Sequence, residues 1–181
     1  KLEEIGEADN TVIVLMGDNG FYLGEHGMAG KWYGHEESIR VPLIIYDPRL
    51  PQDLKGKERE EMALNVDIAP TLLRLANIQP PQDMQGQSLL PLVQGNNPEW
   101  RKQFFYEHRF EKESGKTKIP PSEGVRTERY KYLTYLGHDF EELYDLKKDP
   151  HEINNLAQNP EQQKLLEKMR AKHNNLLQKV K

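Results

Sequence analysis

Apolar and polar positions along the chain predict two segments of different architecture. Residues 11–16 and 41–46 are strand-length runs of β-branched and apolar side chains without alternation. A run of this kind is typical of a strand that is buried on both faces, as in a parallel sheet. Apolar residues at helical spacing over 67–76 predict a helix, for which Asp67 is a plausible N-cap. We therefore expect residues 1–98 to form an α/β domain with a mixed or parallel sheet.

The two ends of this first segment have weaker patterns. Residues 1–9 carry apolar side chains at helical spacing, and we interpret them as the end of a surface helix. Residues 78–98 are rich in proline. We interpret them as a connector with a short helical turn near 88–93.

Alternation becomes the dominant pattern after residue 98. Residues 130–135 alternate between two faces, which is typical of a strand in an antiparallel hairpin. The expected elements are strands at 104–109, 124–128, 130–135 and 142–146 and a helix from Pro160 to about Lys179. Residues 99–181 are therefore predicted to form a small α+β subdomain, an antiparallel sheet with one C-terminal helix.

Composition narrows the class of protein. The chain has 181 residues, of which 36% are hydrophobic and 30% charged, with a net charge of -4. This balance is that of a globular protein, and the mild negative charge argues against nucleic-acid binding. No apolar run approaches the roughly 20 residues of a membrane span, so no membrane partner is expected. Without cysteine, the chain forms neither disulfides nor thiolate metal sites.

The first residues do not resemble a secretory signal, because they lack a basic segment and an apolar core. The chain also starts without Met, in what we interpret as the middle of a helix. We therefore expect further residues upstream, so that the chain is a fragment of a longer protein. Its cellular compartment stays open.

A long loop, residues 17–40, carries the candidate chemistry. It is dense in Gly, His and charged residues, and a loop of this length in a compact domain is usually functional. Asp18 and Asn19 directly follow the first strand, where ligands bind in open α/β sheets. They offer the hard oxygen ligands that Ca²⁺, or Mg²⁺ in its place, takes. The alternative is an ordinary turn, because Asp-Asn-Gly is also a standard turn signal.

Cationic and imidazole groups follow in the same loop. Lys31 lies in a Gly-rich stretch, where an ammonium near a divalent cation binds an anionic group such as sulfate or phosphate. His26 and His35 could donate protons or hydrogen bonds near neutral pH. The alternatives are that Lys31 is a solvated surface residue and that His35 belongs to a helix start. These residues alone leave both interpretations open.

At this point the sequence resembles a known family. The run Gly17–Lys31 and its continuation Glu36–Ile44 are similar to the second half of the catalytic domain of type I sulfatases. These are formylglycine-dependent enzymes of the alkaline phosphatase-like superfamily. Further landmarks of the family follow in order along the chain, at Asn65–Leu72, Gly86–Leu89, Arg126–Tyr132, Glu142–Leu146 and Asp149–Leu156. The resemblance therefore covers nearly the whole chain.

The resemblance implies a sulfuric ester hydrolase, with a sulfated small molecule or carbohydrate as its substrate. It implies that Asp18 and Asn19 are two of the Ca²⁺ ligands and that Lys31 contacts the sulfate during catalysis. We place His26 with the catalytic residues and His35 in the substrate pocket. The C-terminal subdomain often lines that pocket in sulfatases. Its candidates, for which the alternative is an exposed strand or loop residue, are His108, Arg109, Arg126 and His138.

Part of the expected machinery is absent from the sequence. Sulfatases of this family make formylglycine from Cys or Ser in a Cys/Ser-x-Pro/Ala-x-Arg motif, and the nearest pattern here, Ser122–Arg126, has Gly where Pro or Ala is expected. We therefore expect the formylglycine and the remaining acidic ligands in an N-terminal half that packs on this chain. We expect the isolated chain to be inactive. Family analogy points to a periplasmic or secreted enzyme.

Two alternatives to a sulfatase stay open. A phosphonate monoester or phosphodiester hydrolase of the same superfamily would use a similar arrangement of Asp, Asn and Lys. A non-catalytic binding module would keep the loop only as structure.

Overall fold

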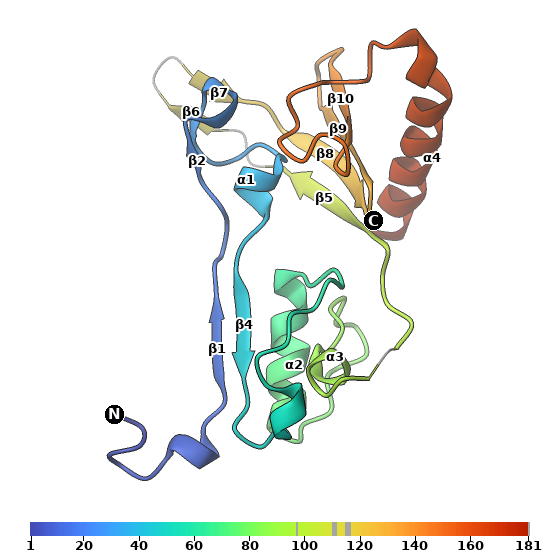
Figure 1. Cartoon of the computed structure of the whole chain (residues 1–181). Coiled ribbons are helices and arrows are strands. Elements are labelled where there is room, and N and C mark those ends of the chain that lie inside the picture. Colours follow the sequence, from blue (N-terminus) through green and yellow to red (C-terminus); the bar gives the residue numbers. More distant parts are fainter. Residues whose placement is uncertain (97, 110–111, 115–116, 181) are drawn as a thin grey trace. The chain divides into compact units, whose positions relative to one another are not determined.

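The computed structural model of the chain describes residues 1–96, 98–109, 112–114 and 117–180 (Figure 1). Within these ranges, the backbone alone is described for residues 112–114, 117 and 118. The chain forms two compact units. The first unit is Lys1–Asp18 with Pro42–Arg101, and the second is Asn19–Val41 with Lys102–Lys181. The long loop after the first strand thus belongs to the same unit as the C-terminal sheet, whereas the sequence assigned it to a domain of residues 1–98.

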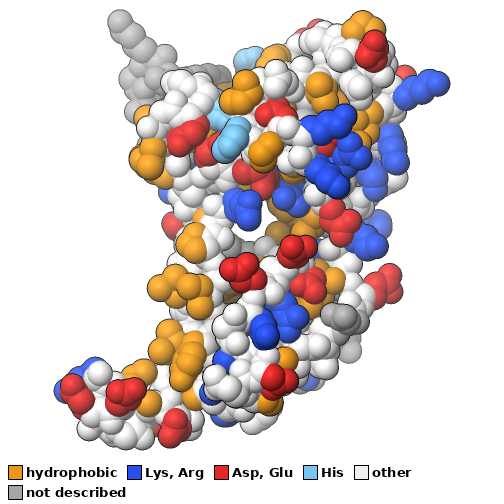
Figure 2. Space-filling view, in the orientation of Figure 1, with side chains coloured by type: hydrophobic (Ala, Val, Ile, Leu, Met, Phe, Trp, Pro, Cys, Tyr) orange, Lys and Arg blue, Asp and Glu red, His pale blue; other side chains and the backbone are white. Residues whose placement is uncertain are grey.

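Two strands form a ribbon in the first unit. β1 (Ile13–Met16) pairs with β4 (Leu43–Tyr46), which confirms both predicted strands. The pairing is antiparallel, and within this chain the two strands are not buried on both faces, although their unbroken apolar runs had led us to expect such burial. An unbroken apolar run indicates apolar faces but does not specify strand direction. Figure 2 shows orange side chains along this ribbon. Those between 45% and 59% exposed are Ile13, Leu15, Ile44 and Tyr46.

The start of the chain agrees with its prediction as the end of a helix. The Ile5 N–H donates to the Lys1 carbonyl at 3.2 Å, the bond of one helical turn. Gly6, with a left-handed φ of 75°, ends this turn, because the N–H groups of Gly6 and Glu7 donate back to the Glu3 and Leu2 carbonyls as in a glycine C-cap. The turn ends before the predicted residue 9, and η1 (Ala8–Asn10), a short 3-10 helix, follows it.

Short helices complete the first unit. They are η3 (Gln52–Leu54), η4 (Asn65–Asp67), α2 (Ile68–Leu75) and α3 (Leu90–Val93). Asp67 occupies the predicted N-cap position of α2, but its side chain makes no capping bond. The fully buried carboxylate instead accepts hydrogen bonds from the backbone N–H of Gln87 at 2.8 Å and from Arg101 Nη2 at 2.7 Å. Asp67 therefore ties the connector to the helix.

A four-stranded antiparallel sheet forms the second unit, as predicted. Its strand order is β10-β9-β8-β5. The strands are β5 (Gln103–His108), β8 (Ser122–Thr127), β9 (Tyr130–Tyr135) and β10 (Glu141–Asp145). A separate ribbon consists of β6 (Lys112–Ser114) and β7 (Thr117–Ile119). The predicted terminal helix is confirmed as η5 (Pro160–Gln162) followed by α4 (Gln163–Val180). Among the described helices, none is long and apolar enough to span a bilayer.

Both faces of this sheet are covered. α4 lies along one face (Figure 1), where Leu166 and Met169 pack with Val125, Tyr132 and Leu143. Successive strand residues point to opposite faces, so the neighbours of Tyr132 in β9 point away from α4. The loop of residues 19–41 covers that second face. The loop contains β2 (Tyr22–Leu23), η2 (Glu25–Gly27), β3 (Ala29–Gly30) and α1 (Glu36–Ile39).

Candidate functional site

The loop of the second unit brings Asn19 and Lys31 together. The Lys31 ammonium donates a hydrogen bond to Asn19 Oδ1 at 2.6 Å. This contact forms because β2 and β3 pair antiparallel, which turns the loop back on itself. Asn19 Nδ2 donates to the Gly20 carbonyl at 2.8 Å, which fixes the orientation of the amide. A cation held in place in this way is preorganised to bind an anion.

Trp32 supports Lys31 from the next position. The Lys31 ammonium lies 5.2 Å from the centre of the Trp32 ring, within the range of a cation–π interaction. The Trp32 carbonyl accepts a hydrogen bond from the Tyr106 hydroxyl at 3.3 Å. Trp32 has a φ of 99°, and a left-handed conformation at such a residue costs on the order of 1–3 kcal/mol. The packing around Trp32 must therefore hold the backbone in this conformation.

Asp18 belongs to the first unit, whereas Asn19 belongs to the second. The backbone carbonyl of Asp18 accepts a hydrogen bond from Asn65 Nδ2 at 2.8 Å, which connects the end of β1 to the start of η4. The two residues are consecutive in the sequence. Their joint role as Ca²⁺ ligands stays a prediction.

The two histidines of the loop stack on each other. The ring centres of His26 and His35 are 4.3 Å apart, at an angle of 19° between the planes. His26 Nε2 lies 3.3 Å from Glu37 Oε2. His35 is only 4% exposed, and its Nδ1 lies 2.8 Å from the Tyr22 hydroxyl. Burial raises the pKa of Tyr22, so the phenol keeps its proton and can donate a hydrogen bond to His35 Nδ1.

Glu142 meets the other side of His35. Its Oε2 lies 3.6 Å from His35 Nε2 and accepts a hydrogen bond from the Tyr135 hydroxyl at 2.9 Å. Burial raises the pKa of Glu142, but the contacts with His35 and Tyr135 outweigh burial and lower it below its usual range. The two nitrogens of the His35 ring thus face different partners, Tyr22 at Nδ1 and Glu142 at Nε2. The predicted roles of His26 and His35 in catalysis and substrate binding remain predictions.

His108 and Arg109 have different surroundings. Both ring nitrogens of His108 are buried, and among the described residues neither has a hydrogen-bond partner of good geometry. Burial lowers the pKa of His108, which favours the neutral imidazole at pH 7. The Arg109 guanidinium is half exposed and pairs with Glu107 at 3.0 Å and with Glu123 at 2.5 Å. These carboxylates already engage Arg109, so a substrate anion would have to compete with them.

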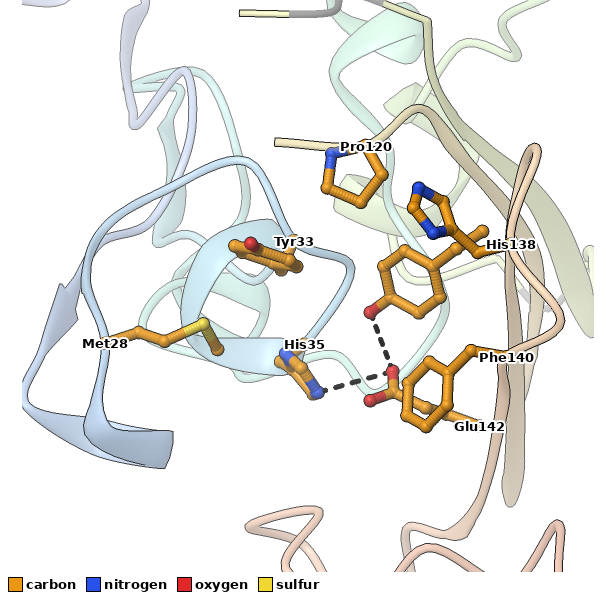
Figure 3. Close-up of a pocket in the computed structure, with 8 residues that line it drawn as sticks. Met28, Tyr33, His35, Pro120, His138, Phe140 and Glu142 are labelled. Carbon is orange, nitrogen blue, oxygen red and sulfur yellow. Dashed lines mark hydrogen bonds and ion pairs between the residues drawn. The ribbon is translucent and has the colours of Figure 1, made fainter. Parts of the chain in front are cut away.

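A pocket of about 340 Å³ lies within the second unit (Figure 3). Its lining residues are Met28, Tyr33, His35, Pro120, Tyr135, His138, Phe140 and Glu142. The structure thus brings two of the candidates, His35 and His138, to one cavity. Arg126 is placed elsewhere: its Nη2 donates to Glu36 Oε2 at 3.3 Å. The candidate substrate residues therefore do not form a single cluster.

A buried ion group was missed by reasoning from the sequence. The Lys131 ammonium, 1% exposed, lies 2.7 Å from Glu36 Oε1 and 2.8 Å from Glu152 Oε1. Burial opposes the charge of Glu36, but Lys131 and Arg126 together lower its pKa below the usual value. The only signal in the sequence was the position of Lys131 between the apolar residues of an alternating strand.

The donor chemistry fits part of a metal site. In the part of the chain that the structure describes, no group of three or more His, Cys, Asp or Glu side chains could hold a metal ion. Asp18 and Asn19 nevertheless offer a carboxylate and an amide oxygen, the ligand types that Ca²⁺ prefers. Ca²⁺ takes roughly six to eight oxygen ligands, so these two residues would be a partial ligand set.

Comparison with known proteins identifies one family. A family model described as N-sulphoglucosamine sulphohydrolase, C-terminal, matches residues 24–179. The chain is 42% identical over 160 residues to an N-acetylglucosamine-6-O-sulfatase of Bacteroides thetaiotaomicron, covering 86% of this chain and 28% of that protein.

Solved structures agree with this match. One structure, in complex with D-glucosamine-2-N,6-O-disulfate as its substrate, has a TM-score of 0.84 and 35% identity, covering 96% of this chain and 35% of that one. The phosphonate monoester hydrolase of Agrobacterium radiobacter has a TM-score of 0.78 and 30% identity, covering 95% and 37% of the two chains. The chain therefore spans about a third of the length of the relatives it matches.

Proposed function

This chain belongs to the family of N-sulphoglucosamine sulphohydrolase C-terminal domains, among the sulfatases of the alkaline phosphatase-like superfamily, and from this we propose that it is the C-terminal part of a sulfuric ester hydrolase. The observation that carries the proposal is the contact between Asn19 and Lys31, of which Lys31 lies inside the segment that matches the family, residues 24–179. One relative is named as an N-acetylglucosamine-6-O-sulfatase, and one similar structure is a complex with a sulfated glucosamine as its substrate. We therefore propose a sulfated carbohydrate as the substrate.

Lys31 binds the sulfate group in this proposal. The sulfuryl oxygens are anionic, and negative charge increases on the leaving oxygen as the S–O bond breaks. The Lys31 ammonium neutralises part of that charge, and Asn19 Oδ1 holds the ammonium in place at 2.6 Å. His26, next to Glu37, supplies a proton or a hydrogen bond at the same loop.

Asp18 and Asn19 would hold a Ca²⁺ ion. When bound, such an ion neutralises charge on the sulfate oxygens as a Lewis acid. The remaining ligands and the formylglycine nucleophile would come from residues outside this chain, which has no cysteine. In this proposal the isolated chain does not hydrolyse sulfate esters.

An N-terminal half of the same enzyme would pack on the β1–β4 ribbon. The support for this contact is the apolar surface of the ribbon, because Leu15 is 54% exposed and Ile44 is 59% exposed. Large exposed apolar side chains on a two-stranded ribbon are typical of a surface that another element covers.

Phosphonate monoester hydrolysis is the second candidate, because one structural neighbour has that activity in its name. The complete protein that contains this chain should be assayed on N-acetylglucosamine 6-sulfate, on the matched 6-phosphate and on an aryl phosphonate monoester. We expect kcat/KM for the sulfate ester to exceed that for both phosphorus substrates by at least about tenfold, a difference of roughly 1.4 kcal/mol. Faster release from a phosphorus substrate would favour the second candidate. No release from any of them would favour a non-catalytic module.

A further inference from the structure

The Lys131 ammonium is a buried charge with three oxygen partners. It donates a hydrogen bond to the Gly34 carbonyl at 3.0 Å and forms ion pairs with Glu36 at 2.7 Å and Glu152 at 2.8 Å. Lys131 itself comes from β9, in the middle of the sheet. Gly34 and Glu36 belong to the loop that carries Lys31, and Glu152 follows β10. The ion group therefore joins the loop to two separate parts of the C-terminal sheet region.

Glu152 holds the same loop at a second point. Its Oε2 accepts a hydrogen bond from the backbone N–H of Glu36 at 2.6 Å. Glu152 is 1% exposed and has a φ of 52°, a left-handed conformation that the surrounding structure must maintain. The side chain of Glu36 also accepts from Arg126 Nη2 at 3.3 Å. The loop backbone is thus held at one carbonyl, Gly34, and at one N–H, Glu36.

Stability alone is a poor explanation for such a group. Burying an ion group costs several kcal/mol per charge, and apolar side chains of similar size often give equal or greater stability. A buried charge that loses its partner is strongly unfavourable, so other arrangements of the joined segments are disfavoured. Such a group therefore selects one arrangement of these segments. The arrangement specified here is that of residues 34–36.

The path from this group to Lys31 is short. Gly34 follows Lys31 by three residues, and the intervening Trp32 carbonyl is held by the Tyr106 hydroxyl at 3.3 Å. Gly34 packs so closely on the sheet that an added Cβ would lie 2.6 Å from Leu133 Cδ2. The segment between Lys31 and Glu36 therefore has little freedom to shift while these contacts persist.

We propose that Lys131, together with Glu36 and Glu152, is a positioning group that fixes the loop so that the Lys31 ammonium meets the sulfate group of the substrate. The inference rests on the proposed sulfatase function. It also assigns a role to the C-terminal sheet, which holds one wall of the active site in place. Lys131 acts through the loop backbone and does not itself touch the substrate.

The test replaces Lys131 with Met in the complete protein. A misplaced Lys31 weakens sulfate binding, so KM for N-acetylglucosamine 6-sulfate should rise at least about tenfold. A smaller fraction of folded enzyme would instead lower Vmax and leave KM unchanged. Glu152→Gln keeps the side-chain volume and should raise KM in the same direction, which keeps the test decisive if Lys131→Met fails to fold. Arg129→Gln, which removes a partly exposed guanidinium from its pair with the buried Asp145 at 2.7 Å, is the matched control and should leave KM unchanged.

Amide hydrogen exchange gives a readout that does not depend on activity. In Lys131→Met and Glu152→Gln, the Glu36 amide and the α1 amides should exchange at least about tenfold faster, while the β8–β9 ladder stays protected. This result would support the positioning role even if the wild-type protein hydrolysed no sulfate, an outcome that would sink only the proposed function. Faster exchange across the whole sheet, or an unchanged loop with unchanged KM, would overturn the positioning role.

Discussion

Gly20 allows the loop to approach α1 closely, and its replacement should disturb the site. A Cβ at this position would overlap the Glu37 carbonyl oxygen and lie 2.9 Å from the Glu37 carbonyl carbon and 3.2 Å from that of Ser38. These are backbone atoms, so no change of rotamer relieves the overlap. One of the two segments would have to retreat by roughly 1 Å. This retreat would also lengthen the hydrogen bond that the Gly20 N–H donates to the Ser38 carbonyl at 2.8 Å.

The displacement reaches the candidate site at once, because Asn19 precedes Gly20 and accepts the hydrogen bond from Lys31. A shift of about 1 Å in a positioned group can cost about a hundredfold in rate. We expect Gly20→Ala in the complete protein to lower kcat/KM for a sulfated amino sugar by about a hundredfold, or roughly 2.7 kcal/mol. Overpacking should also reduce the free energy of unfolding by about 1–3 kcal/mol. Sulfate release and urea denaturation measure the two effects.

Gly137→Ala is the control. Gly137 lies in the turn between β9 and β10, has a φ of 79°, and has open space where a Cβ would stand. The substitution should cost about 1 kcal/mol of stability, through backbone strain alone, and leave kcat/KM unchanged. A folded Gly20→Ala enzyme that keeps kcat/KM within threefold of the wild type would refute the close approach as a requirement of the site.

Three further outcomes follow from the same structure. Leu166 is a core residue of α4 that is 1% exposed, so Leu166→Ala should lower the free energy of unfolding in urea by about 2–5 kcal/mol. Val180 in the same helix is 43% exposed, so Val180→Ala should lower it by less than about 0.5 kcal/mol. Equal losses for the two variants would contradict the assigned core. Burial opposes the charge of Glu36, but Lys131 and Arg126 lower its folded-state pKa below the usual 4.5, so the ion group stabilises the fold above that pH and less as the pH falls through the folded pKa. In urea denaturation at a series of pH values, Glu36→Gln should therefore lose less stability on acidification than the wild type. Identical pH profiles for the two proteins would refute the ion pairing of Glu36. Chelation with EDTA should abolish the activity of the complete protein until Ca²⁺ is restored. Ca²⁺ at a hundredfold its Kd should stabilise the wild type by about 2.7 kcal/mol and the Asn19→Ala variant by less. An equal stabilisation of the two proteins would exclude Asn19 as a ligand.

Elements with a local pattern could be predicted from the sequence. The alternation over residues 130–135 and the apolar stripe of α4 are set by neighbours in the chain, and both elements lie where the pattern places them. The direction of the β1–β4 pair could not be predicted, because an apolar run describes a strand's faces and not its partner. The helix end at the start of the chain is also local, because the left-handed Gly6 closes a helical turn of its immediate neighbours.

The candidate site divides in the same way. Asn19 and Lys31 were named from their types and order in the loop, and the structure joins them by a hydrogen bond. Lys131 was not named, because the pattern of β9 cannot show that a distant loop covers its second face. The burial of His35 likewise depends on Glu142, more than a hundred residues away in the sequence. Contacts between distant segments are what the sequence alone could not supply.

The most direct test of the central claim is sulfate release by the complete protein carrying Lys31→Ala. We expect kcat/KM for N-acetylglucosamine 6-sulfate to fall by at least about a hundredfold, because an ammonium that stabilises the charge of the transition state is lost. The thermal midpoint should change little, since Lys31 packs only against Asn19 and Trp32 among the contacts described for it. A folded Lys31→Ala enzyme with kcat/KM within threefold of the wild type would contradict the account.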